Sequence, residues 1–70
     1  MKKAVLTTAE SAILALLSEQ PGRVYSAAEI YEKIWRQTPI GAENVIAVHI
    51  YHLRNKGYKI KTVWRRGYKI

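Results

Sequence analysis

The sequence predicts a small α+β domain in which three helices precede a C-terminal β-hairpin. Three observations carry this prediction: two helix-capping patterns, an apolar stripe with helical spacing in residues 41–57, and alternation of apolar and polar residues after residue 57. A chain of 70 residues can bury only about 60% of the surface that its unfolded form exposes. We therefore expect residues 1–70 to form one compact domain around a single layer of core.

The first helix is expected to begin at a capping box. Thr7 is followed three residues later by Glu10, so each side chain can bond the other residue's backbone N–H group. Gln20-Pro21-Gly22 is expected to end this helix. Residues 3–6, ahead of it, are a candidate for a short extra strand. The apolar stripe of the helix consists of Ile13, Leu14, Leu16 and Leu17.

A second capping box follows a short extended segment at Val24-Tyr25. Ser26 is its cap and Glu29 stands three residues later. Thr38-Pro39 is expected to end the second helix, because proline restricts the residue before it and cannot continue the backbone hydrogen bonds. The apolar residues of this helix are Ile30, Ile34 and Trp35.

The third helix spans residues 41–57 in our prediction. Ile46, Ile50 and Leu53 recur at the spacing i, i+4, i+7, which places them on one core-facing stripe. Gly57 is well placed as the residue just beyond the helix, where a left-handed backbone conformation is common. The face opposite the stripe is therefore expected to point to solvent.

The hairpin is expected to follow directly. Residues 58–64 alternate with a period of two, Arg65-Arg66-Gly67 forms the turn, and residues 68–70 form the return strand. A two-stranded hairpin is only marginally stable by itself, so this one must dock on the helices. The residues expected to dock it are Ile60, Tyr68 and Ile70.

The charge of the chain is concentrated in its C-terminal part. Residues 1–40 hold five basic and four acidic side chains, whereas residues 41–70 hold seven basic side chains and Glu43 alone. Such segregation is typical of a surface that binds a polyanion. A helix followed by a basic hairpin is also the arrangement of the winged helix-turn-helix, in which one element can enter the major groove of DNA and the other the minor groove.

Three runs of residues strengthen this interpretation. They are Pro21-Gly22-Arg23-Val24-Tyr25-Ser26, Val48-His49-Ile50-Tyr51-His52-Leu53-Arg54 and Ile60-Lys61-Thr62-Val63-Trp64-Arg65-Arg66-Gly67-Tyr68. The chain resembles, from about Leu6 to Ile70, the DNA-binding domain of OmpR/PhoB-type response regulators. The resemblance implies a winged helix-turn-helix that binds promoter DNA, often as a tandem pair on direct repeats, and regulates transcription. A dimer on double-stranded DNA is thus expected.

The chain departs from this family in three ways. It contains no phosphorylatable receiver domain and no aspartate, the family's N-terminal four-stranded sheet is missing or reduced to residues 3–6, and Lys56-Gly57-Tyr58 replaces a longer linker before the wing. These departures predict a stand-alone effector domain, and one hypothesis for its role is to act as a partner of a full-length response regulator.

The outward face of the third helix is the first predicted DNA-binding site. Its spacing matches the positions from which family members touch DNA. The asparagine amides can pair with adenine, the valines can pack on a thymine methyl, and the histidines and tyrosine can donate to phosphate or purine acceptors. Arg54, at the edge of this face, is predicted to bind phosphate. For the face as a whole, the alternative is a plain solvated helix surface. The face comprises Asn44, Val45, Val48, His49, Tyr51, His52 and Asn55.

The wing is the second predicted site and includes Thr62. Trp64 falls where an arginine of the family commonly enters the minor groove, and it either lies there or packs against the base of the hairpin. Arg65 or Arg66 could enter in its place, because a narrow A·T-rich groove attracts arginine. Trp35, at the end of the second helix, either donates to a DNA phosphate or packs in the core.

Other chemistries find little support. His49 and His52 have a spacing that could chelate a metal, but no cysteine or aspartate supplies further ligands. No glycine-rich phosphate loop or catalytic set of side chains occurs, so we expect neither an enzyme nor a bound cofactor or metal. The longest apolar stretch, residues 12–17, is too short for a membrane span. We expect a cytoplasmic, nucleoid-associated protein.

Two alternatives to DNA binding remain open at this point. A protein-interaction module would keep the fold but use Val45, Val48 and Tyr51 to contact a full-length regulator, a sigma factor or RNA polymerase. The resemblance also assigns residues 36–42 to a loop that contacts RNA polymerase in some family members. Binding of single-stranded RNA is the other alternative, but no aromatic sheet platform is predicted.

Overall fold

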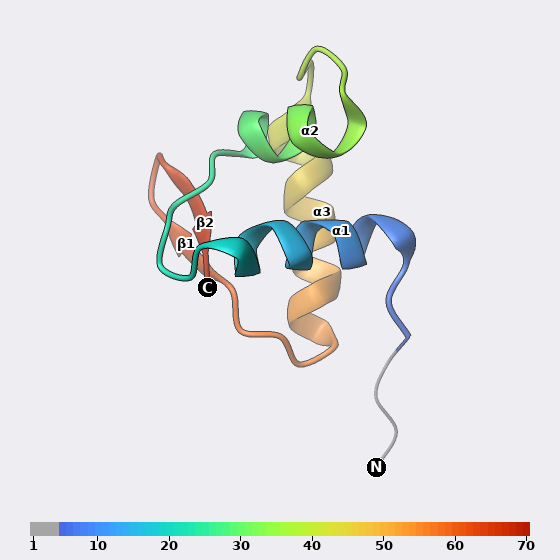
Figure 1. Cartoon of the computed structure of the whole chain (residues 1–70), viewed down its shortest axis with the longest axis vertical. Coiled ribbons are helices and arrows are strands. Elements are labelled where there is room, and N and C mark those ends of the chain that lie inside the picture. The colour runs from blue at the N-terminus through green and yellow to red at the C-terminus, as the bar shows by residue number, and fades with distance from the viewer. Residues whose placement is uncertain (1–4) are drawn as a thin grey trace.

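A computed structural model describes residues 5–70 and confirms the predicted order of elements. Three helices are followed by a two-stranded antiparallel sheet, as Figure 1 shows. Within the described residues, no helix is both long and apolar enough to cross a membrane. The elements are α1 (Thr8–Glu19), α2 (Ala27–Trp35), α3 (Ala42–Asn55), β1 (Lys61–Val63) and β2 (Gly67–Lys69).

The capping box predicted at the start of α1 is confirmed. The backbone N–H of Glu10 donates to Thr7 Oγ1 at 3.1 Å, and the Thr7 N–H donates to Glu10 Oε1 at 2.9 Å. Both bonds satisfy backbone donors that have no partner inside the helix. The helix ends at Glu19, just before the predicted stop at Gln20-Pro21-Gly22.

Helix α2 differs from the prediction at both ends. The Ser26 hydroxyl accepts from the Glu29 N–H at 3.0 Å, but the Glu29 carboxylate bonds the Arg23 guanidinium at 2.6 Å instead of closing the capping box. The helix stops at Trp35, before Thr38-Pro39. Proline is not the cause, because Arg36 already adopts a left-handed conformation (φ 56°) and donates its N–H to the carbonyl of Glu32.

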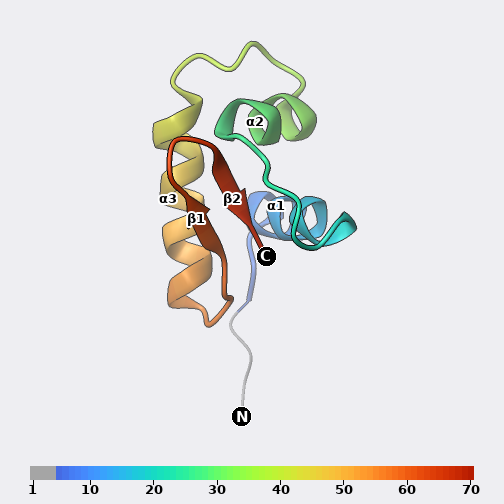
Figure 2. The same ribbon diagram turned by 90° about the vertical axis from the view of Figure 1, so that its left-hand side faces the viewer.

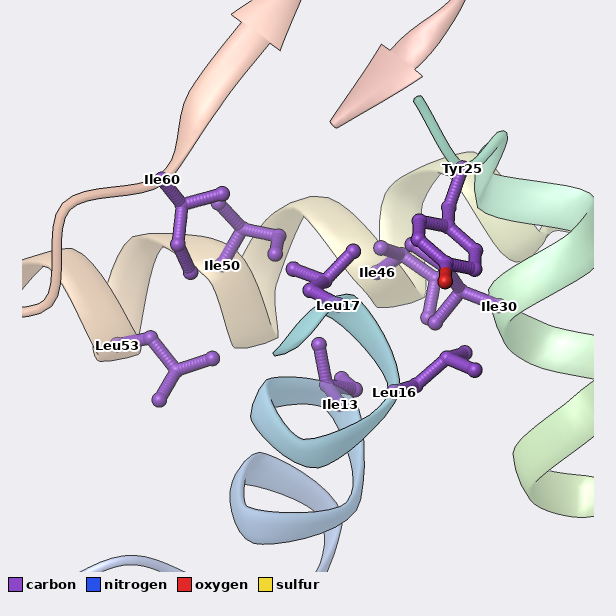
Figure 3. Packing of buried hydrophobic residues seen from close by; sticks show 9 residues of the cluster. All are labelled: Ile13, Leu16, Leu17, Tyr25, Ile30, Ile46, Ile50, Leu53 and Ile60. Carbon is purple, nitrogen blue, oxygen red and sulfur yellow. The ribbon is translucent and has the colours of Figure 1, made fainter. Parts of the chain in front are cut away.

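The core lies where the three helices meet, and Figure 3 shows its side chains pointing toward one another. The stripe predicted on α3 is confirmed, since Ile46, Ile50 and Leu53 are buried. Helix α1 crosses α3 (Figures 1 and 2). Of the stripe predicted on α1, Leu14 is only half-buried. The buried apolar cluster consists of Ile13, Leu16, Leu17, Tyr25, Ile30, Ile46, Ile50, Leu53 and Ile60.

Strand β1 begins three residues later than predicted. Residues 58–60 form no ladder with β2, because their backbone groups bond the end of α3: the Tyr58 N–H donates to the Leu53 carbonyl at 3.2 Å, and the Ile60 carbonyl accepts from Arg54. Docking of the hairpin through three apolar side chains is confirmed. Ile60 is buried, and Tyr68 and Ile70 are half-buried against the core.

A third segment pairs with the hairpin. Tyr25 and Tyr68 exchange both backbone hydrogen bonds, each at 2.9 Å, in an isolated antiparallel bridge. The sequence predicted an extended conformation at Val24-Tyr25 but not this pairing. The bridge joins the connection between α1 and α2 to β2, which therefore has a pairing partner on each side.

The turn of the hairpin is shifted by one residue from the prediction. It comprises Trp64, Arg65 and Arg66, while Gly67 pairs with Val63 as the first residue of β2. The Arg66 N–H donates to the Val63 carbonyl at 2.9 Å. Arg65 takes the left-handed conformation (φ 62°) for which glycine is usual in such turns.

The extra strand considered for residues 3–6 is not formed by the part of it that the structure describes. Val5 and Leu6 have no strand conformation, and residues 3 and 4 lie outside the described range.

Gly67 lies close against the segment that connects α1 and α2. A Cβ atom placed there would meet the Tyr25 carbonyl oxygen at 2.0 Å and the Ser26 Cα at 2.8 Å, and its φ of 143° also disfavours other residues. We therefore expect Gly67→Ala to push the wing away from Tyr25 and to lower the free energy of unfolding. The loss should exceed the about 1–2 kcal/mol that backbone strain alone costs at a left-handed residue.

Gly57→Ala is the matched control, because Gly57 also has a positive φ (100°) but nothing lies within 4 Å of its Cβ position. Urea denaturation of the two variants measures the difference, and amide exchange of Tyr25 and Tyr68 reports the bridge. Equal destabilisation with an intact bridge in both variants would contradict the close approach at Gly67.

Candidate nucleic-acid interface

The outward face of α3 is exposed as predicted. Burial of Ile46, Ile50 and Leu53 leaves the opposite side of the helix to solvent. Val48 and Tyr51 are 52% and 62% exposed, which is unusual for large apolar side chains on a plain solvated surface. The exposed side chains of this face are Asn44, Val45, Val48, Tyr51, His52 and Asn55.

His49 differs from its neighbours on this face because it is half-buried. Its ring stacks on Trp35, with 5.7 Å between the centroids and 26° between the planes. The ring of Tyr31 also packs against Trp35, with 5.1 Å between the centroids. Both alternatives predicted for Trp35 retain support, since the indole is half-buried in this cluster but reaches the edge of the α3 face.

Arg54 ties α3 to the root of the wing. Its Nε and Nη2 atoms donate to the Ile60 carbonyl at 2.9 and 2.6 Å, and Nη2 also donates to Thr62 Oγ1 at 2.7 Å. The sequence suggested only that Arg54 binds phosphate and that Thr62 touches DNA. Both side chains therefore have a structural partner that spacing along the chain did not reveal.

The wing tip is exposed. Trp64 is 77% exposed, so the alternative in which it packs against the base of the hairpin is wrong. Arg65 and Arg66 are also exposed. The tip therefore presents one aromatic and two guanidinium groups together.

A cleft of about 540 Å³ separates the wing from the helices. It lies between the N-terminal ends of α2 and α3 and the inner side of the hairpin. Its wall mixes small apolar residues with polar ones, and Glu43 is its acidic member. Its polar lining includes Ser26, Asn44, Thr62, Arg65 and Arg66.

Glu10 forms a buried ionic contact that the sequence did not predict. Lys56 Nζ bonds Glu10 Oε1 and also donates to the Val5 carbonyl at 2.9 Å, while His52 Nδ1 lies 3.9 Å from Glu10 Oε2. The Lys56 ammonium, followed by the Thr7 N–H, lowers the pKa of the Glu10 carboxyl below its usual value. The capping box identified Glu10 only as a cap. Lys56 was counted among the charges of the basic region, but its ammonium group bonds Glu10 and the Val5 carbonyl within the fold.

The same contact bears on His52. Although its side chain is half exposed, one ring nitrogen faces a carboxylate that the fold holds in place. Among residues 5–70, no group of three or more histidine, cysteine, aspartate or glutamate side chains is placed to hold a metal ion.

Comparison with known proteins identifies the family. Residues 1–70 match the family described as "Transcriptional regulatory protein, C terminal". The chain belongs to this family. It is 40% identical over 77 residues to the regulatory protein VanR of Enterococcus faecium, covering 99% of this chain and 33% of VanR. It is 36% identical to the response regulator SaeR of Staphylococcus epidermidis, covering 86% of this chain and 29% of SaeR.

These matches confirm the OmpR/PhoB-type resemblance. The chain is a DNA-binding domain of the kind found in bacterial transcriptional regulators, and its three helices with a hairpin form the expected winged helix-turn-helix. It spans about one third of the curated relatives that it matches. The stand-alone effector predicted from the sequence accordingly stays a prediction.

The Glu10–Lys56 contact has a pH-dependent consequence. The pKa of Glu10 is lower in the folded than in the unfolded protein, so its stabilising contribution is present above the unfolded value of about 4.3 and is lost as the pH falls toward the folded value. Glu10→Gln should therefore lower the free energy of unfolding at pH 7, and this difference from the wild type should shrink below about pH 4.

Urea denaturation of both proteins from pH 3 to 7 measures this profile. Glu19→Gln is the control, because Glu19 is exposed on the same helix and makes no hydrogen bond or ion pair within residues 5–70. That substitution should change stability by less than about 0.5 kcal/mol. A Glu10→Gln effect that does not vary with pH would show that the ionic contact contributes nothing.

Proposed function

We propose that this domain is a sequence-specific regulator of transcription that places α3 in the major groove and the β1–β2 wing at the adjacent minor groove. The observation that carries the proposal is the exposed, nearly uncharged face of α3 beside a uniformly basic hairpin. Residues 58–70 contain five basic side chains and no acidic one. Uncharged groups suit the reading of base edges, whereas surrounding cations suit phosphate contacts that position the protein.

The roles on α3 follow from side-chain chemistry. Asn44 and Asn55 offer paired donor and acceptor groups to adenine, and Val45 and Val48 offer methyl groups to thymine. Tyr51 can donate to phosphate. These side chains are exposed and share one helix face, so they can meet one groove together.

His49, His52 and Trp35 complete the proposed interface at its edges. The stacking of His49 on Trp35 supports a role for their ring N–H groups as donors to the DNA backbone. His52 is exposed and has one ring nitrogen 3.9 Å from Glu10 Oε2, and its ring can donate a hydrogen bond to the DNA backbone. Arg54 and Thr62 act here mainly by holding the wing.

Protein partners are proposed on a separate observation. Ile40, in the connection between α2 and α3, is 82% exposed. An apolar side chain in that position supports contact with RNA polymerase or with a full-length response regulator, in addition to DNA binding. We further propose a dimer on direct repeats, and action in the cytoplasm at the nucleoid, where promoter DNA lies.

Selection from random duplex DNA in excess non-specific competitor tests the proposal. Recovery of a motif would give the operator, whereas recovery of none from folded protein would favour the protein-interaction alternative. The recovered motif then serves as the labelled duplex in binding measurements.

Val48→Glu should reduce the affinity for the specific site at least about 100-fold. The new carboxylate would be buried in the major groove without a hydrogen-bond donor and would repel the phosphates. Ala15→Glu is the matched control, since it adds the same charge at an exposed position of α1 away from the interface. Fluorescence anisotropy with the labelled site measures both variants. Equal affinities of the two variants would count against α3 as the recognition element.

Salt should weaken binding steeply. If each of the five basic side chains of residues 58–70 neutralises one phosphate, log K should fall against log salt with a slope of about −4.5. Titrations between 50 and 200 mM salt measure the slope. A slope near zero would show that the basic side chains of the wing do not contact phosphates.

A further inference from the structure

Trp64 and Arg65 form a stacked pair at the tip of the wing. The guanidinium carbon of Arg65 lies 4.5 Å from the centroid of the Trp64 ring. Arg65 reaches this position from a left-handed backbone conformation (φ 62°), which only a few per cent of residues other than glycine adopt. The tip therefore presents the two side chains together, with the guanidinium of Arg65 over the Trp64 ring.

The surroundings of the pair indicate what it contacts. The indole is 77% exposed, although a large aromatic side chain gains free energy when it leaves water. The hairpin around it carries Lys59, Lys61, Arg66 and Lys69 but no acidic side chain. A partner must therefore be strongly anionic and must also offer a flat apolar surface. Duplex DNA offers both where a base step opens, because phosphates line the groove and the opened step exposes the face of a base.

The thickness of the pair limits how it can enter the minor groove. Two planar groups in van der Waals contact need about 7 Å, given about 3.5 Å for each layer. When the indole stacks on a base, this thickness runs along the DNA axis, where successive bases of B-form DNA are only about 3.4 Å apart. The pair can therefore enter only where a base step opens.

We propose that Trp64 and Arg65 enter the minor groove together as a wedge, so that the wing selects DNA by its deformability. This inference rests on the proposed function and adds a second source of specificity to it. Arg65 covers one face of the indole and leaves the other face to stack on a base at the opened step. Side chains inserted in this way unstack a base step and bend the duplex.

The wedge predicts a preference opposite to that of an arginine acting alone. Narrow, stiff A-tracts attract single arginines, whereas TA steps are flexible and open easily. The sequence suggested that Arg65 or Arg66 would seek a narrow A·T-rich groove. The stacked geometry of Arg65 selects the flexible step instead.

Two duplexes of identical composition test this. Both carry the selected site for α3, and the six base pairs under the wing read TATATA in one and AAATTT in the other. We expect the wild-type domain to bind the TATATA duplex about 10-fold more tightly. A 2-aminopurine at the TA step should become brighter on binding, because its base loses a stacking neighbour.

Substitutions at Trp64 separate the wedge from the rest of the interface. The side chain is exposed and contributes nothing to the buried core, so the variants should fold. Trp64→Ala and Trp64→Arg should lose the preference and the fluorescence change but still bind the selected site better than a scrambled one. Trp64→Phe, which keeps a planar ring, should retain part of both signals.

The outcomes are distinct. Equal affinity for the two duplexes, tighter binding of AAATTT, or a preference that survives in Trp64→Ala would overturn the wedge while specific binding stands. In that case a protein partner would be the better explanation of the exposed indole. A wild-type domain that does not distinguish the selected site from a scrambled one would overturn the proposed function itself.

Discussion

Burial of the apolar stripe of α3 is the constraint on which the rest of the structure depends. Ile46, Ile50 and Leu53 are removed from water against α1 and α2, and this fixes the rotation of α3 about its own axis. A helix held at one rotation presents a fixed opposite face. The spacing of three apolar residues thus determines which side chains can reach a groove, although none of those three contacts DNA in the proposed complex.

The wing depends on the same helix through a second set of contacts. Arg54 bonds the backbone just before β1, and Tyr25 pairs with β2 from the other side. A hairpin with three residues in each strand would not be stable alone. Because both attachments end on the body that holds α3, the distance between the recognition face and the wing tip is set by the fold.

Local patterns predicted most of the fold. The capping box of α1, the apolar stripe of α3 and the docking residues of the hairpin were confirmed. The capping box predicted for α2 was wrong, because the Glu29 carboxylate bonds Arg23. Contacts between distant segments could not be predicted, because spacing carries no signal for them. Glu10 was recognised as a cap but not as the partner of Lys56. The exposed α3 face was predicted except for His49, which is half-buried against Trp35. The bonds of Arg54 to the root of the wing and the contact of Arg65 with Trp64 had no signal in the sequence.

The Tyr25–Tyr68 bridge has a consequence for the order of folding. It joins two residues that are far apart in sequence, while each helix forms from contacts a few residues apart. Closing a long loop costs chain entropy before the contact returns any stability, so such pairings tend to form late. We expect a chain with complete helices and an unattached wing to precede the native state. Under mild destabilisation we expect the wing to detach first. The helices would then persist in a state that binds DNA more weakly.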